Sequence, residues 1–404
     1  MTTLSPTSPT DSTFAALRVR NYRTWFAGQA VSLVGTWMQS VALSWLAFEL
    51  SASGSVIGFV MAAQFVPVLV LGAYGGLLAD RMDKRRLLLL TQGALGTLSL
   101  LLAVLVLGGL IALWMVFVIA VLLGVAVSVD TPTRQSFVIE MVGAEHVQNA
   151  VSLNSILVNA SRAVGPAMAG VLIAAFGVGV CFAVNAASFV AVLAALVLMR
   201  RDELLPAPPL ARARGQLRDG LRYVRGTPEL AVPLVMMGIV GCFAYEFPVV
   251  LPLVAREALH GGPTTFGLLT SAMGVGAVAG GLVIASRRRT GTGALSLAAV
   301  GFGVAIALAA AAPGLGTALA AMLLVGAGSV AFMSTGNTTL QLTAAPEYRG
   351  RVMALWAVTF QGSTPIGGPI IGAISEFAGP RIGLGVGAAA CLLAALVGLG
   401  AVER

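Results

Sequence analysis

A series of twelve apolar runs is the feature that most constrains the fold of this sequence. A transmembrane helix needs about 20 apolar residues to cross a bilayer, and each run is close to that length. Charged residues make up 10% of the chain, against about 25% in a soluble domain, so lipid has to be the solvent for most of its surface. We therefore predict an all-α integral membrane protein with twelve transmembrane helices. The runs lie near residues 26–50, 55–79, 87–109, 112–130, 150–176, 180–199, 230–254, 264–286, 293–312, 316–337, 352–376 and 382–402.

The basic residues indicate how the helices are oriented. Lys and Arg together number 24, of which 21 fall in connections on the N-terminal side of the membrane, whereas Arg256 and Arg381 fall on the other side and Arg162 lies within a run. Cytoplasmic connections carry an excess of Lys and Arg. We predict a protein of the bacterial inner membrane with both termini in the cytoplasm and no cleaved signal peptide.

The runs form two groups of six. Residues 1–13, rich in Ser, Thr and Pro, are expected to be a disordered cytoplasmic tail. Residues 14–200 would form an N-terminal six-helix half, 201–229 a cytoplasmic linker, and 230–404 a C-terminal six-helix half. The second part of the linker, 216–225, either forms a surface helix beside an anionic leaflet or remains a solvated connection, and the sequence favours neither.

A Gly-Pro pattern is shared by the two groups. The fifth run contains Gly165 and Pro166 and closes with Gly170, and the eleventh contains Gly368 and Pro369 in corresponding places. Small residues of this kind let helices pack closely. Two halves of similar pattern are typical of transporters, whose binding site lies between the halves near the bilayer midplane. We therefore expect pseudo-symmetric halves, with these five residues as helix-packing positions.

The connection between the second and third runs carries a family resemblance. Residues 76–86, GLLADRMDKRR, resemble the signature of the major facilitator superfamily, with Asp83 in place of its second glycine. The fifth-run Gly-Pro pair is similar to a motif of drug exporters in that superfamily. Residues 17–26 (LRVRNYRTWF), 35–39 (GTWMQ) and 130–134 (DTPTR) look like its enterobactin-exporter and multidrug-efflux branch.

This resemblance implies a gating motif at the cytoplasmic surface. In the family, the loop's Asp faces the N-terminus of the eleventh helix, where the helix dipole favours an anion. Carried over, Asp80 faces that helix and Lys84 pairs with Asp130, which would stabilise the outward-open state. Taken from the residues alone, the same charges can be topology signals without a latch. The implied motif comprises Gly76, Asp80, Arg81, Lys84, Arg85 and Asp130.

Two full charges lie deep within apolar runs, Arg162 in the fifth and Glu246 in the seventh. A charge at bilayer depth costs at least about 2.5 kcal/mol, so each one is informative. We predict that Glu246 is the proton-coupling residue, because a carboxylate can titrate there and an Arg cannot. For Arg162, a substrate-binding role and a structural role are equally supported. The expected substrate cavity comprises Trp37, Gln39, Asn159, Arg162, Tyr245, Phe360 and Gln361.

Other kinds of chemistry are poorly supported. Cys181, Cys242 and Cys391 are isolated within apolar runs, and His146 and His260 lie far apart, so we predict no metal site, disulfide or cofactor. An enzyme needs clustered acids, bases or metal ligands, which this sequence does not supply. Basic residues are spread over short connections rather than collected in one domain, which argues against nucleic-acid binding.

These observations predict a secondary active transporter that exports amphipathic small molecules, drug-like or siderophore-like, by proton antiport. The alternative is uptake or facilitated transport of a small solute by the same fold. A membrane-embedded enzyme and a membrane scaffold are weaker alternatives. The expected partners are the small-molecule substrate, protons and membrane lipid, and a monomer is expected.

Overall fold

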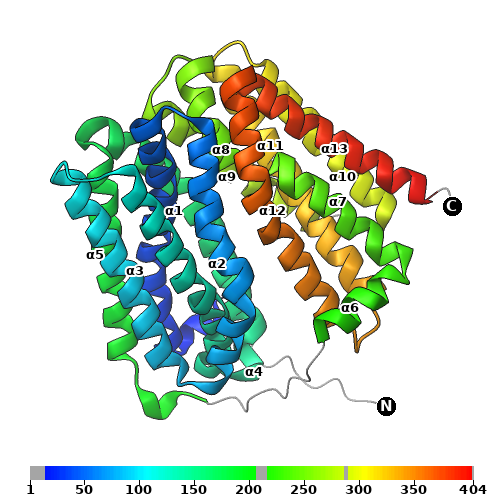
Figure 1. Ribbon diagram of the computed structural model, residues 1–404. Helices are drawn as coiled ribbons and strands as arrows, with labels where there is room; N and C mark the ends of the chain where they lie inside the picture. The colour runs from blue at the N-terminus through cyan, green and yellow to red at the C-terminus, as the bar shows by residue number, and fades with distance from the viewer. Residues whose placement is uncertain (1–13, 206–215, 286–289, 403–404) are drawn as a thin grey trace.

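The computed structural model describes residues 14–205, 216–285 and 290–402, and every regular element in these ranges is a helix (Figure 1). The first half contains α1 (Arg20–Ser51), α2 (Gly54–Arg81), α3 (Lys84–Leu107), α4 (Leu113–Phe176) and α5 (Val178–Leu198). The second half contains α7 (Pro228–Ala244), α8 (Phe247–Leu253), α9 (Pro263–Ala285), α10 (Thr292–Ala311), α11 (Leu315–Thr343), α12 (Arg349–Ala378) and α13 (Pro380–Val402). Shorter elements are η2 (Ala15–Arg18), η3 (Arg201–Glu203), α6 (Gln216–Arg225) and the π-helical turn η4 (Val254–Ala258).

The number of membrane crossings follows from helix length and hydropathy. Ten segments of the described chain are long and apolar enough to cross a membrane, and one of them, α4, has 64 residues. A straight helix of that length would extend about 96 Å, roughly three times the thickness of a bilayer core. α4 breaks at Gly143, whose φ of 70° and ψ of 175° are not helical, and so crosses twice. α12 is not among the ten, but its 30 residues are long enough to cross a bilayer core, and it packs against α2 and α7. With α12 as a further crossing, the predicted twelve-helix membrane fold is confirmed.

The fourth crossing extends well beyond the predicted run 112–130. Residues 131–142 continue α4. Asp130 therefore lies inside a helix, whereas the predicted run placed it at the end of one. The extension buries Phe137 in a cluster with Tyr22. A helix that leaves the bilayer needs only one apolar face, so its sequence lacks the continuous apolar signal of a membrane span.

The predicted single helix over 230–254 is instead two helices. α7 ends and α8 begins on either side of Tyr245 and Glu246, which are not helical. Pro248 suits the first turn of α8, because that turn needs no backbone N–H donor. Non-helical backbone at membrane depth is tolerated only where it is buried in protein or lines a cavity. The break therefore marks a position with a function beyond spanning the bilayer.

The two halves meet differently at the two ends of the bundle. We call the end that carries α6 and the α2–α3 turn the linker end, and the opposite end the distal end (Figure 1). Toward the distal end α2 and α12 lie side by side, with Gly54 against Gly372 and Gly58 against Gly368. The backbones approach this closely because none of these residues has a side chain. Toward the linker end α2 and α12 diverge (Figure 1).

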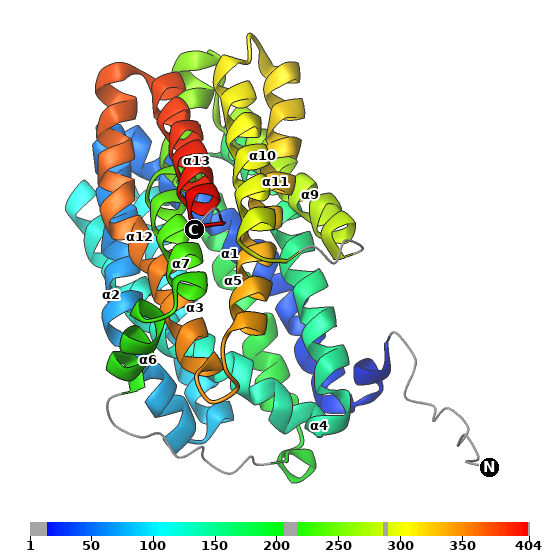
Figure 2. The same cartoon turned by 90° about the vertical axis from the view of Figure 1, so that its right-hand side faces the viewer.

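The second part of the linker is the helix α6, one of the two forms considered for it, and it lies beside the linker-end part of α12 (Figure 2). Tyr223 of α6 stacks on Tyr348, with ring centres 4.2 Å apart. The Tyr223 hydroxyl also accepts a hydrogen bond from the Ala345 N–H at 3.2 Å. These contacts fix α6 to the second half. The predicted tail 1–13 and the basic residues 287–289 lie outside the described residues.

Candidate functional site

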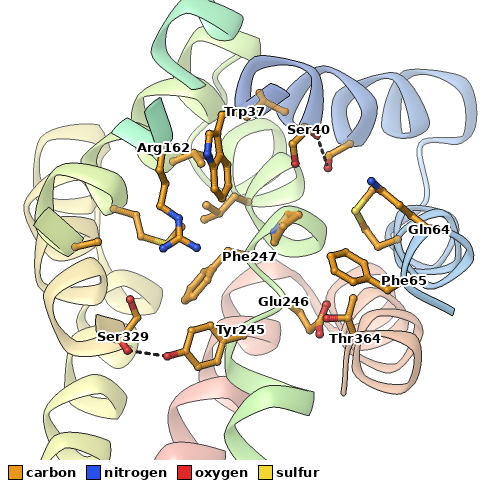
Figure 3. A pocket seen from close by; sticks show the side chains of 18 of the residues that line it. Trp37, Ser40, Gln64, Phe65, Arg162, Tyr245, Glu246, Phe247, Ser329 and Thr364 are labelled. Atoms are coloured by element: carbon orange, nitrogen blue, oxygen red, sulfur yellow. Dashed lines mark hydrogen bonds between the residues drawn. The ribbon is translucent and has the colours of Figure 1, made fainter. Parts of the chain in front are cut away.

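A cavity of about 340 Å³ lies between the two halves, with walls from α1, α2 and α4 on one side and from α8, α9, α11 and α12 on the other (Figure 3). The break between α7 and α8 also faces it. The predicted cavity residues that line it are Trp37, Arg162, Tyr245, Phe360 and Gln361. Five of the seven predicted cavity residues therefore come together in one cavity between the halves.

Glu246 lies in the helix break with 2% of its surface exposed. Its Oε1 atom has no hydrogen-bond partner among the described residues, and Thr364 of α12 lies beside the carboxyl group (Figure 3). Gly368 of α12 also packs beside the group, since a Cβ atom there would lie 3.4 Å from Glu246 Oε2, an ordinary van der Waals contact. Ionising such a buried carboxyl group costs free energy, because one of its oxygen atoms has no hydrogen-bond donor beside it.

Arg162 reaches the cavity from α4, in the other half. Its Cζ atom lies 4.9 Å from the centre of the Trp37 ring in α1, which is a cation–π contact. α1 and α4 approach closely because Gly165 sits against Trp37 and Val34. Arg162 and Glu246 line the same cavity from opposite halves (Figure 3). They form no ion pair with each other.

Aromatic rings make up much of the wall around these charges. The Tyr245 hydroxyl donates a hydrogen bond to the Ser329 carbonyl oxygen at 2.7 Å, and the Tyr245 ring packs against Phe302 and Phe360 with centres 5.3 Å apart in each case. Tyr245 is thereby fixed directly before Glu246. Phe65, Phe247 and Phe266 extend the apolar lining.

Two predicted cavity residues lie elsewhere. Gln39 is buried within the first half, where its Oε1 atom accepts hydrogen bonds from Ser99 at 2.6 Å and from Asn185 at 2.7 Å. Asn159 donates its side-chain amide to the Ser155 carbonyl oxygen of its own helix at 2.8 Å, and it does not line the cavity. Both predictions were wrong because polar side chains bond whichever partner lies near them, and the sequence does not give the helix rotation that decides whether they face the cavity.

Several polar residues of the cavity were not singled out for it from the sequence. Serine and threonine are common in membrane helices and often bond their own backbone, as Ser44 does to the Ser40 carbonyl oxygen at 3.2 Å. They therefore give no signal until the helices are placed. The missed polar lining residues are Ser40, Ser44, Gln64, Thr270, Ser329 and Thr364.

The gating motif at the linker end has a different pairing from the one expected. Lys84 forms an ion pair with Glu140 of α4, not with Asp130. Asp130 is buried and accepts hydrogen bonds from Thr91 and Gln92, each at 2.8 Å. Glu140 is available because α4 continues past Asp130 for more than two further turns, which the sequence did not reveal. The expected Lys84–Asp130 pair is thus corrected to Lys84–Glu140.

Other motif residues fix the ends of helices. Arg85 donates to the carbonyl oxygens of Leu196 at 2.6 Å and Val197 at 3.0 Å, at the C-terminus of α5, where a cation is favoured. Asp83 caps α3 by accepting from the Arg86 N–H at 2.8 Å. Its φ of −58° needs no glycine, which explains why Asp can replace the family's second glycine.

The remaining motif residues, Gly76, Asp80 and Arg81, lie in the last turns of α2, with Gly76 buried, Asp80 half-buried and Arg81 exposed. α2 and α12 diverge toward this end of the bundle (Figure 1). The contact between Asp80 and the start of α12 therefore stays a prediction for another conformation.

Fold and site together define the class of protein. Helices in two halves around a central cavity with few charges are the architecture of a major facilitator superfamily transporter. The fold is similar to the crystal structure of a bacterial homolog to the human lysosomal transporter Spinster, with a TM-score of 0.75 and 13% identity over 98% of both chains. At this identity the likeness shows the fold alone.

The chain belongs to the transmembrane secretion effector family, whose sequence model matches residues 11–402. It is 29% identical over 274 residues to an uncharacterized MFS-type transporter of Bacillus subtilis, which covers 66% of this chain and 64% of that one. It is 25% identical over 261 residues to the staphyloferrin A transporter of Staphylococcus aureus, covering 64% and 65%. It is 26% identical over 223 residues to the enterobactin exporter of Salmonella typhimurium, covering 54% and 51%.

Each of these matches spans less than two thirds of the relative's length. The resemblance to the major facilitator superfamily is confirmed, and these relatives are transporters, not enzymes. The chain is a multi-pass membrane protein.

Proposed function

We propose that this protein is a secondary active transporter that exports amphipathic small molecules across the bacterial inner membrane in exchange for protons. The observation that carries the proposal is a buried carboxyl group, Glu246, in a cavity shared by both halves. Basic residues gather at the linker end, so that end faces the cytoplasm.

The lining of the cavity suits an amphipathic solute. Phe65, Phe247, Phe266 and Phe360 provide apolar surface, whereas amide and hydroxyl groups provide hydrogen bonds at separate points. Ligand sites of this kind are mostly apolar with a few placed polar groups that fix orientation.

Competition at Glu246 couples the two movements. A substrate that enters from the linker end binds ionised Glu246 through a hydrogen-bond donor or a cationic group. When the cavity opens at the distal end, a proton from outside protonates the Glu246 carboxylate and the substrate dissociates. The returning protein carries the proton inward and releases it at the linker end. Export is thereby driven by the proton gradient.

The relatives support the outward direction. The family is described as secretion effectors, and one relative is an enterobactin exporter. Another is a staphyloferrin A transporter, so siderophore-like compounds belong in the first panel of substrates to be tested.

The proposal is tested with everted membrane vesicles, in which the cytoplasmic face is outside and respiration acidifies the interior. Siderophores and amphipathic dyes are added one at a time, and a pH-sensitive acridine dye reports proton release. Wild-type protein is expected to release protons on addition of a transported compound, whereas Glu246→Gln is expected to release none. Proton release by Glu246→Gln at the wild-type rate and pH dependence would show that Glu246 does not couple transport.

A matched control is Glu347→Gln, which removes an exposed carboxylate in the connection before α12. This variant is expected to behave as wild type. Equal amounts of each variant in the membrane, measured by immunoblot, exclude loss of protein as the cause.

A further inference from the structure

The guanidinium group of Arg162 lies in the cavity, and no carboxylate of the described residues forms an ion pair with it. Among the described residues, none pairs with it or accepts a hydrogen bond from it, and Trp37 is its one close aromatic contact. The side chain is half-buried and points into the cavity (Figure 3). Its N–H donors therefore face the space where a solute binds.

Three other acids of the described helices are bonded elsewhere. Glu49 accepts the indole N–H of Trp45 at 2.6 Å, and Asp130 accepts two side-chain hydrogen bonds in the first half. Glu376 is bonded to α2 at the distal end. Glu246 is on the opposite wall of the cavity (Figure 3).

We propose that Arg162, held in place by Trp37, binds an anionic group of the transported molecule. The inference rests on the proposed function and names the substrate class, namely amphipathic molecules that carry one anionic group at a distance from a hydrogen-bond donor or cationic group. In the bound molecule, the anionic group contacts Arg162 of the first half, and the donor or cationic group contacts Glu246 of the second half.

The chemistry of the two walls sets this class. A guanidinium group offers planar, paired N–H donors that match a carboxylate or sulfonate. The ring of Trp37 fixes its position without competing for those donors, because an aromatic ring contacts a cation through its face. A second anionic group next to Glu246 would face a like charge whenever that carboxylate is ionised. The cavity therefore suits one anion and not several.

The test uses two probes of nearly the same size and shape, 6-(dansylamino)hexanoic acid and its uncharged primary amide. Binding to the purified full-length protein in detergent is followed by dansyl fluorescence. Wild-type protein is expected to bind the acid roughly tenfold more tightly than the amide, as one charged hydrogen-bonded contact predicts. Arg162→Gln is expected to abolish that preference while keeping the affinity for the amide.

Two further variants make the outcome decisive. Arg162→Lys, which keeps the charge but not the planar donor pair, is expected to retain a weaker preference for the acid. Arg256→Gln removes an exposed arginine at the distal end and is expected to leave the preference unchanged. A preference in Arg162→Gln equal to that of wild type would overturn the inference. So would equal binding of acid and amide by wild-type protein, even if Arg162→Gln does not fold. Either result leaves proton exchange at Glu246 standing, since that is measured by transport and not by this binding.

Discussion

Glu376 and Ser55 join the two halves of the protein at the distal end. The Oε2 atom of Glu376, near the end of α12, accepts hydrogen bonds from the Ser55 N–H at 3.0 Å and the Ser55 hydroxyl at 2.7 Å. It accepts a third from the Ser53 hydroxyl, also at 2.7 Å. Because Ser53 caps α2, the carboxylate lies where the helix dipole favours an anion. Opening the distal end requires all three bonds to break.

We expect Glu376→Gln to shift the protein toward distal opening. An amide keeps the shape of the side chain but loses the charge that strengthens these bonds, which costs about 1 to 2 kcal/mol at a partly exposed site. The distance between spin labels at Leu110→Cys and Leu315→Cys, both at the distal end, is measured by double electron–electron resonance after the native cysteines are replaced. A longer-distance population is expected to increase several-fold.

The corresponding control is Glu203→Gln, which removes an exposed carboxylate near the linker end. It is expected to leave the distance distribution as in wild type. An unchanged distribution in Glu376→Gln would mean that the glycine contacts alone hold the distal end closed.

Those glycine contacts give a second prediction. A Cβ atom on Gly58 would press on the Gly368 carbonyl oxygen, so Gly58→Ala should separate α2 from α12 and favour distal opening in the same spin-label measurement. Gly72→Ala, in the same helix, has no neighbouring atom within 4 Å of the new Cβ. It is expected to change nothing except helix propensity, a gain of at most about 1 kcal/mol. Equal distance distributions in the two variants would show that the close approach of the α2 and α12 backbones does not control opening of the distal end.

A third prediction concerns the corrected ion pair. The side chains of Lys84 and Glu140 are 10% and 12% exposed, and removing one partner leaves an uncompensated buried charge. Lys84→Met and Glu140→Gln should each lower the thermal stability of the purified protein, and the double variant should lose less than the sum. A coupling of about 1 kcal/mol is expected. When Lys84→Met is combined with Asp130→Asn, the two losses of stability should be close to additive. Coupling between Lys84 and Asp130, with none between Lys84 and Glu140, would support the pairing expected from the family resemblance.

The membrane fold could be predicted from the sequence because the length of an apolar run is set by the thickness of the bilayer. The parts that were missed are those where this constraint does not act. Residues 131–142 of α4 lie beyond the span, so an amphipathic helix there has no continuous apolar run. The break at Tyr245 and Glu246 was missed because the hydropathy of a run does not report the conformation of its backbone. Pro248, which favours the start of a helix, was a signal for it.

Site residues could be predicted where burying the side chain costs so much free energy that its residue type is rare in apolar runs. Arg162 and Glu246 stand out in apolar runs, and both line the cavity. The amide side chains of Gln39 and Asn159 cost less free energy to bury than a charged side chain, and they bond to partners in their own half or helix. Whether such a residue faces a cavity depends on helix rotation, which one sequence does not determine.

The last prediction concerns Tyr245, which directly precedes Glu246 in the helix break. Its hydroxyl bonds the Ser329 carbonyl oxygen at 2.7 Å, so it fixes the break against α11. Tyr245→Phe keeps the ring packing and removes one hydrogen bond, which should cost about 1 kcal/mol of stability. Because the helix break is then held less firmly against α11, the carboxyl group is positioned less firmly, and the pH profile of proton-driven transport should also shift. Tyr74→Phe, at a side chain 69% exposed, is the control. If both variants transport with the wild-type pH profile, Tyr245 only packs and does not position Glu246.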